Sequence, residues 1–81
     1  MKLINDRGKY SYETKLSLRN GGTITGNFKA EIFNTEAVAK EWVKRFIIKD
    51  KSEWLEFETK EKGMLFIAKK EIQSIQINFK N

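Results

Sequence analysis

The chain has 81 residues, and its sixteen lysines and arginines exceed its eleven acidic residues, which gives a net charge of +5. It contains no cysteine and no histidine, which excludes disulfides, thiolate or imidazole metal sites, and Ser-His or Cys-His catalytic pairs. We expect one domain over residues 1–81. A domain this short hides only about 60% of the surface that its unfolded chain exposes, and self-association is the reinforcement left open.

The positive charge permits an anionic partner, although basic residues are spread over both halves of the chain. The apolar run at the N-terminus ends by Asn5, which is too early for a signal peptide. No apolar stretch approaches the roughly 20 residues needed to span a bilayer. We therefore expect a soluble, cytoplasmic protein without a membrane partner.

Two alternating stretches that meet at Asn20-Gly21-Gly22 predict a β-hairpin. One side of the first stretch carries Tyr10, Tyr12, Thr14, Leu16 and Leu18. The second stretch runs from Thr23 to about Phe33, with Ile24, Gly26, Phe28, Ala30 and Ile32 on its apolar side. A glycine on that side indicates a sharp bend or a close backbone approach.

A helix is expected over about residues 35–46, with Thr35 as its cap. Val38, Trp42 and Phe46 recur every four residues and form its apolar stripe. Residues 42–48 also alternate tolerably, so helix and strand both remain open for that segment. Trp42 and the later Trp54 are interpreted as core residues.

The segment from Trp54 to Thr59 reads as a strand with an apolar face and a glutamate face. The glutamates around it are Glu53, Glu56, Glu58 and Glu61. We interpret them as solubilising residues, or as the guard of a sheet edge, in preference to a catalytic carboxylate pair. A turn is expected at 61–63, with Gly63 in the left-handed position.

Met64 to Ala68 is apolar on both faces, which predicts a strand buried on both sides. Ile72 and Ile75 are three residues apart, as in one turn of a tight helix. A last strand follows, with Ile75, Ile77 and Phe79 alternating. The whole pattern predicts a mostly β fold, a small and strongly bent five-stranded barrel with one helix. The alternative is an open antiparallel sheet with the helix packed on one face, because both arrangements fit the periodicities.

Two segments resemble the two motifs of the Sm-like family, which includes bacterial Hfq and the LSm proteins. "LSLRNGGTITGNF" is similar to the first motif, and "MLFIAKKEIQSIQI" is similar to the second. The resemblance implies a barrel of the SH3 or Sm type, assembly into an oligomeric ring, and RNA binding. This chain differs from the family in the segment from Thr35 to about Asp50, which lies between the second and third strands.

The resemblance implies RNA contacts at Lys69 and Lys70 in the tight turn and at Asn34, near the position where the family reads a base. Lysines in that turn would neutralise phosphates. The alternative interpretation is an ordinary solvated turn, and an Asn that supports the start of the helix. The sequence holds no phosphate loop, metal set or nucleophile beside a base, so we expect neither catalysis nor a cofactor.

Two functions follow as hypotheses. The first is a non-catalytic, oligomeric RNA-binding module of the Sm-like kind. The second is a protein–protein interaction module with the same barrel fold and no nucleic-acid role, in which the inserted helix with Trp42 and Phe46 supplies the added surface.

Overall fold

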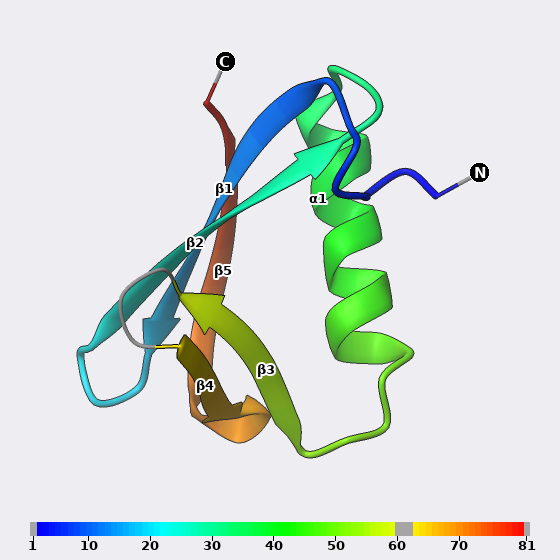
Figure 1. Ribbon diagram of the computed structural model, residues 1–81. Helices are drawn as coiled ribbons and strands as arrows, with labels where there is room; N and C mark the ends of the chain where they lie inside the picture. The colour runs from blue at the N-terminus through cyan, green and yellow to red at the C-terminus, as the bar shows by residue number, and fades with distance from the viewer. Residues whose placement is uncertain (1, 60–62, 81) are drawn as a thin grey trace.

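The computed structural model describes residues 2–59 and 63–80 (Figure 1). In chain order the elements are β1 (Tyr10–Leu18), β2 (Thr23–Ala30), α1 (Thr35–Val43), a π-helical turn (Lys44–Ile48), β3 (Trp54–Thr59), β4 (Gly63–Ala68), a 3-10 turn (Lys69–Glu71) and β5 (Ile72–Phe79). The predicted mostly β fold, with five strands and one main helix, is confirmed.

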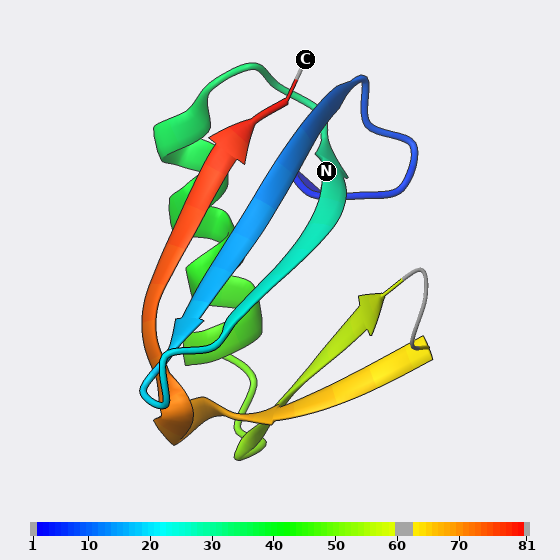
Figure 2. The same cartoon turned by 90° about the vertical axis from the view of Figure 1, so that its left-hand side faces the viewer.

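The strands form two antiparallel sheets: three strands in the order β2-β1-β5, and the separate pair β3-β4. Within the described residues these sheets do not close into a barrel, and the arrangement is compatible with the open-sheet alternative. Side-chain packing joins the sheets where β2 approaches β3. Figure 2 shows β5, β1 and β2 side by side in front of the helix, with the β3–β4 hairpin beside the lower end of the sheet.

The predicted hairpin between β1 and β2 is confirmed, with Ser17 paired to Thr23. Gly21 has φ +92°, a conformation that glycine adopts without steric cost. β2 ends at Ala30 and not near Phe33 as the sequence suggested. Beyond this end the Tyr12 hydroxyl donates a hydrogen bond to the carbonyl oxygen of Ile32 (3.0 Å).

The helix begins at Thr35, as expected, but its cap lies one residue earlier than predicted. Asn34, and not Thr35, is the N-cap, and its Oδ1 accepts a hydrogen bond from the backbone N–H of Ala37 (3.1 Å). Residues 42–48 are helical, since α1 continues into the π-helical turn. The predicted apolar stripe faces the core: Val38 and Trp42 are buried and Phe46 is half-buried.

The three-residue spacing of Ile72 and Ile75 has a different cause from the one inferred. The tight helical turn is Lys69–Glu71, and both isoleucines lie in β5. Leu16 pairs with Ile75, whereas Leu18 pairs with Ile72, so the register shifts by one residue between them. This β-bulge places both isoleucines against the core although they are an odd number of residues apart.

One hydrophobic cluster joins both sheets and the helix. Its buried members are Ile4, Tyr12, Leu16, Ala30, Val38, Trp42, Leu55, Phe57, Ile67 and Ile77. Gly26 permits the junction, because a Cβ at this position would lie 2.2 Å from Cε1 of Phe57. The sequence predicted a sharp bend or a close backbone approach at this glycine, whereas the group that approaches it is the aromatic side chain of Phe57 on β3.

Two burial predictions are wrong. Trp54 is not a core residue: it is 51% exposed, on the same face of β3 as Glu56 and Glu58. β4 is not buried on both sides, since Met64 and Phe66 are exposed while Ile67 is buried. The core cluster covers only one face of the β3–β4 pair. Gly63 has the expected left-handed φ of +73°, while Glu61 and the rest of that turn lie outside the described residues.

Candidate functional site

The residues expected to bind RNA lie at opposite ends of the helical segment. Asn34 caps its start, and its side-chain oxygen is engaged by the Ala37 N–H. Lys69 lies at its other end, where its ammonium donates to the carbonyl oxygens of Asp50 (2.6 Å) and Ile47 (3.3 Å). The intervening segment, residues 35–48, spans about 20 Å at a rise of 1.5 Å per residue. The fold therefore does not bring Asn34 and Lys69 together into one site.

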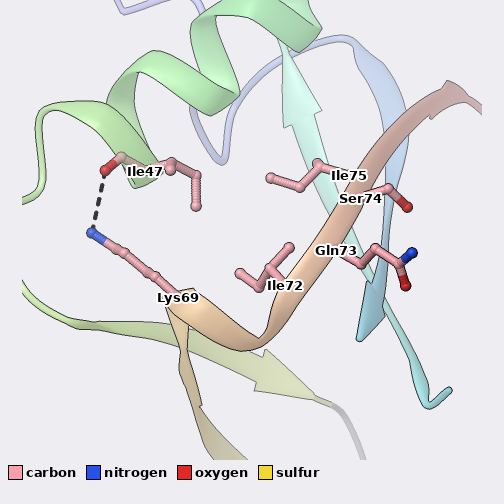
Figure 3. Close-up of a pocket in the computed structure, with 6 residues that line it drawn as sticks. All are labelled: Ile47, Lys69, Ile72, Gln73, Ser74 and Ile75. Carbon is pink, nitrogen blue, oxygen red and sulfur yellow. Dashed lines mark hydrogen bonds between the residues drawn. The ribbon is translucent and has the colours of Figure 1, made fainter. Parts of the chain in front are cut away.

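Lys69 forms part of the wall of a shallow hollow of about 230 Å³ between the end of the helical segment and β5. Figure 3 shows Ile47, Ile72 and Ile75 facing one another, while the Lys69 ammonium reaches the Ile47 carbonyl. The hollow has the lining residues Ile47, Lys69, Ile72, Gln73, Ser74 and Ile75. Because its one cation already holds the chain that follows the helix, we assign Lys69 a structural role.

Lys70 is exposed and lies beside a cation that the sequence analysis did not single out. Arg19 Nε donates to the carbonyl oxygen of Lys70 (2.8 Å), and the Arg19 N–H donates to that of Glu71 (2.9 Å). Lys70 and Arg19 therefore share one exposed corner, formed by the β1–β2 hairpin and the tight turn. Two cations could contact phosphate there.

The most distinctive surface is the solvent-facing side of the β3–β4 hairpin, which we call the outer face. It consists of Trp54, Glu56 and Glu58 on β3 and Met64 and Phe66 on β4. Glu56 pairs with Phe66, Glu58 with Met64, and Trp54 with Ala68. Trp54 is 51%, Met64 50% and Phe66 57% exposed.

The exposed apolar side chains of this face are neighbours. Met64 and Phe66 are two residues apart on the same side of β4, hence about 6.7 Å apart along the strand. Trp54 is diagonal to Phe66, within reach for a long side chain. Three large apolar groups thus form one exposed cluster, and large exposed clusters mark interaction sites in soluble proteins.

The outer face is also negatively charged. In the described stretches 53–59 and 63–68, the ionisable residues are Glu53, Glu56 and Glu58. Over the whole of residues 53–68 the sequence has four glutamates and two lysines, a net charge of −2, so the remaining residues must carry +7 to give the total of +5. Glu56 and Glu58 thus place two carboxylates on the face that carries the exposed apolar side chains.

The sequence analysis missed Trp54, Met64 and Phe66 as surface residues. The signal was present at Trp54, because period-two alternation places it on the side of Glu56 and Glu58 and not on that of Leu55 and Phe57. No comparable signal exists in β4, where both faces are apolar. Only the pairing of β4 with β3 shows which face of β4 is exposed, namely the face it shares with Glu56 and Glu58.

No group of three or more His, Cys, Asp or Glu side chains in the described part of the chain could hold a metal ion. The helices of residues 2–59 and 63–80 are all too short or too polar to cross a membrane. No protein-family model matches the chain, and neither the curated proteins nor the solved structures contain a match. The resemblance to the Sm-like family stays a prediction.

Proposed function

We propose that this protein is a non-catalytic protein-interaction module that binds its partner through the outer face. The observation that carries the proposal is the exposed cluster of Trp54, Met64 and Phe66. The opposite side of the same hairpin is anchored in the core by Leu55, Phe57 and Ile67. A hairpin that buries one face in the core and exposes large apolar side chains on the other offers a docking surface.

The cluster retains apolar area that a partner can remove from water. Burying a large apolar side chain completely contributes about 1.5–3 kcal/mol, and half of each of these three remains exposed. Covering them would contribute on the order of 1 kcal/mol each. Aromatic anchors of this kind dominate the energetics of many protein interfaces.

The negative charge of the outer face favours a protein partner over RNA. Exposed aromatic side chains can stack on bases, but here Glu56 and Glu58 lie beside them and would repel phosphates. Lys70 of the tight turn and Arg19 of the β1–β2 hairpin are on a different part of the surface. RNA binding at that corner remains the second hypothesis, and ring assembly remains a prediction of the resemblance.

A selection from a displayed random-peptide library tests the proposal without assuming the chemistry of the partner. The wild-type protein should enrich a set of peptides, and Phe66→Ser should lose them. Ile48→Ser is the matched control, because Ile48 is 63% exposed but belongs to the helical segment. It should retain the enriched peptides.

The same proteins are titrated with mixed-sequence single-stranded RNA. Phe66-dependent enrichment without measurable RNA binding supports the proposal. Enrichment that does not depend on Phe66, or no enrichment at all, contradicts it. RNA binding that is lost with Arg19→Glu and Lys70→Glu would instead support the second hypothesis.

A further inference from the structure

We infer that the segment bound by the outer face is a basic amphipathic helix of a partner protein. This inference rests on the proposed function and adds the chemistry of the partner. It follows from how charge and apolar surface are divided between the two strands of the hairpin.

The outer face consists of two parallel columns of different chemistry. The β4 column presents Met64 and Phe66, and the β3 column presents Glu56 and Glu58 directly opposite them. Neighbouring strands lie about 4.8 Å apart, so each exposed apolar side chain has a carboxylate beside it. Trp54 extends the apolar surface across to β3 at the end where its opposite residue is the small Ala68.

A complementary partner must present an apolar row and a basic row side by side. One extended strand laid on the face directs a single row of side chains toward it, because its alternate residues point away. A helix presents adjacent rows at once, since residues i, i+3 and i+4 share one side. Four helical residues rise about 6 Å, which is close to the spacing of about 6.7 Å between Phe66 and Met64 along β4.

The negative charge of the outer face then favours a basic partner helix over an acidic one. Lysine or arginine next to the apolar row would meet Glu56 and Glu58, whereas acidic residues there would be repelled. Exposed ion pairs at the rim of an apolar contact guide association and are weakened by salt. The rest of this chain is itself basic, with a net charge of +7 outside residues 53–68. A second copy of the chain is therefore the competing occupant of the face, and the test has to include it.

Two synthetic amphipathic helices with the same apolar pattern provide the test. One carries lysine at every position beside the apolar row, and the other carries glutamate there. Each is titrated into the ¹⁵N-labelled full-length protein. We expect the lysine peptide to shift the signals of Trp54, Glu56 and Phe66, to bind more weakly as salt is raised, and to bind much better than the glutamate peptide.

A charge exchange makes the test specific. Glu56→Lys combined with Glu58→Lys should weaken the lysine peptide by roughly 2- to 30-fold, the equivalent of two exposed ion pairs. The same variant should bind the glutamate peptide better than the wild type does. Glu36→Lys reverses an exposed charge on the helix instead and should change neither affinity.

Each other outcome overturns the inference. If both peptides bind equally well and both need Phe66, the charge of the partner does not matter and the inference is wrong. The proposed function would then still hold. Shifts elsewhere on the protein, or none, would show that a basic helix is not the occupant. The library selection tests the proposed function independently, because the random peptides include both basic and acidic sequences. Light scattering that shows a wild-type dimer, lost with Phe66→Ser, would assign the face to a second copy.

Discussion

Replacing Gly26 by alanine should disturb the junction between the two sheets. A Cβ on this residue would lie 2.2 Å from Cε1 and 2.4 Å from Cζ of Phe57, whereas ordinary contact begins at 3.4 Å. The ring, which is 8% exposed, would have to retreat by about 1.2 Å in a packed core. Such overpacking costs about 1–3 kcal/mol, and the lower entropy of the unfolded alanine chain offsets about 0.4–1 kcal/mol. We expect a net loss of about 1–2 kcal/mol.

A double-mutant cycle identifies the cause of this loss. Leucine at position 57 lacks the two ring atoms that would be too close, so Gly26→Ala should cost clearly less in a Phe57→Leu background. Urea unfolding gives the free energies, and each kcal/mol should also lower the melting temperature by about 4–8 °C in a domain of this size. If Gly26→Ala is as stable as the wild type, or costs the same in both backgrounds, the ring does not pack on Gly26 as described.

Three further substitutions test the core and the helix by the same unfolding measurement. Trp42→Ala should cost about 3–5 kcal/mol, because the ring is buried against Phe46 and the core, and a loss below about 1 kcal/mol would contradict that burial. Asn34→Ala should cost about 0.5–2 kcal/mol, because it removes the cap of α1, and no change would show that the cap is not formed. Thr14→Val should raise stability by about 1 kcal/mol, since the Thr14 hydroxyl is buried without a hydrogen-bond partner among the described residues, and a loss would indicate that the hydroxyl is bonded after all.

Local chemistry made the first hairpin and the helix predictable. An Asn-Gly step between alternating strands determines the turn, and a four-residue apolar repeat determines the buried side of the helix. Gly26 was identified as a place of close approach, but its partner was not, because Phe57 is distant in sequence and reaches it only through tertiary packing. The β-bulge was misread for a related reason: the spacing of Ile72 and Ile75 fits a helical turn locally, and only pairing with β1 shows it to be a register shift.

The candidate site was less predictable than the fold. The resemblance to the Sm-like family implied that Lys69 contacts phosphate, yet its ammonium donates to the carbonyl oxygens of Ile47 and Asp50, which no sequence pattern indicates. The residues of β4 are equally apolar on both faces. Only the pairing of β4 with β3 therefore determines which of its faces is exposed. Surface apolar residues are the ones that sequence reasoning assigns to the core by default.

Tryptophan fluorescence tests most directly the claim that the outer face is free in the isolated protein and covered by the partner. The chain has two tryptophans, and Trp42→Phe leaves Trp54 as the single reporter. The account predicts water-like emission that a soluble quencher readily reduces, and a blue shift with protection from the quencher when the lysine peptide or a library-selected peptide is added. Emission that is already shielded in the free monomer, or that does not change when such a peptide binds, would contradict the account.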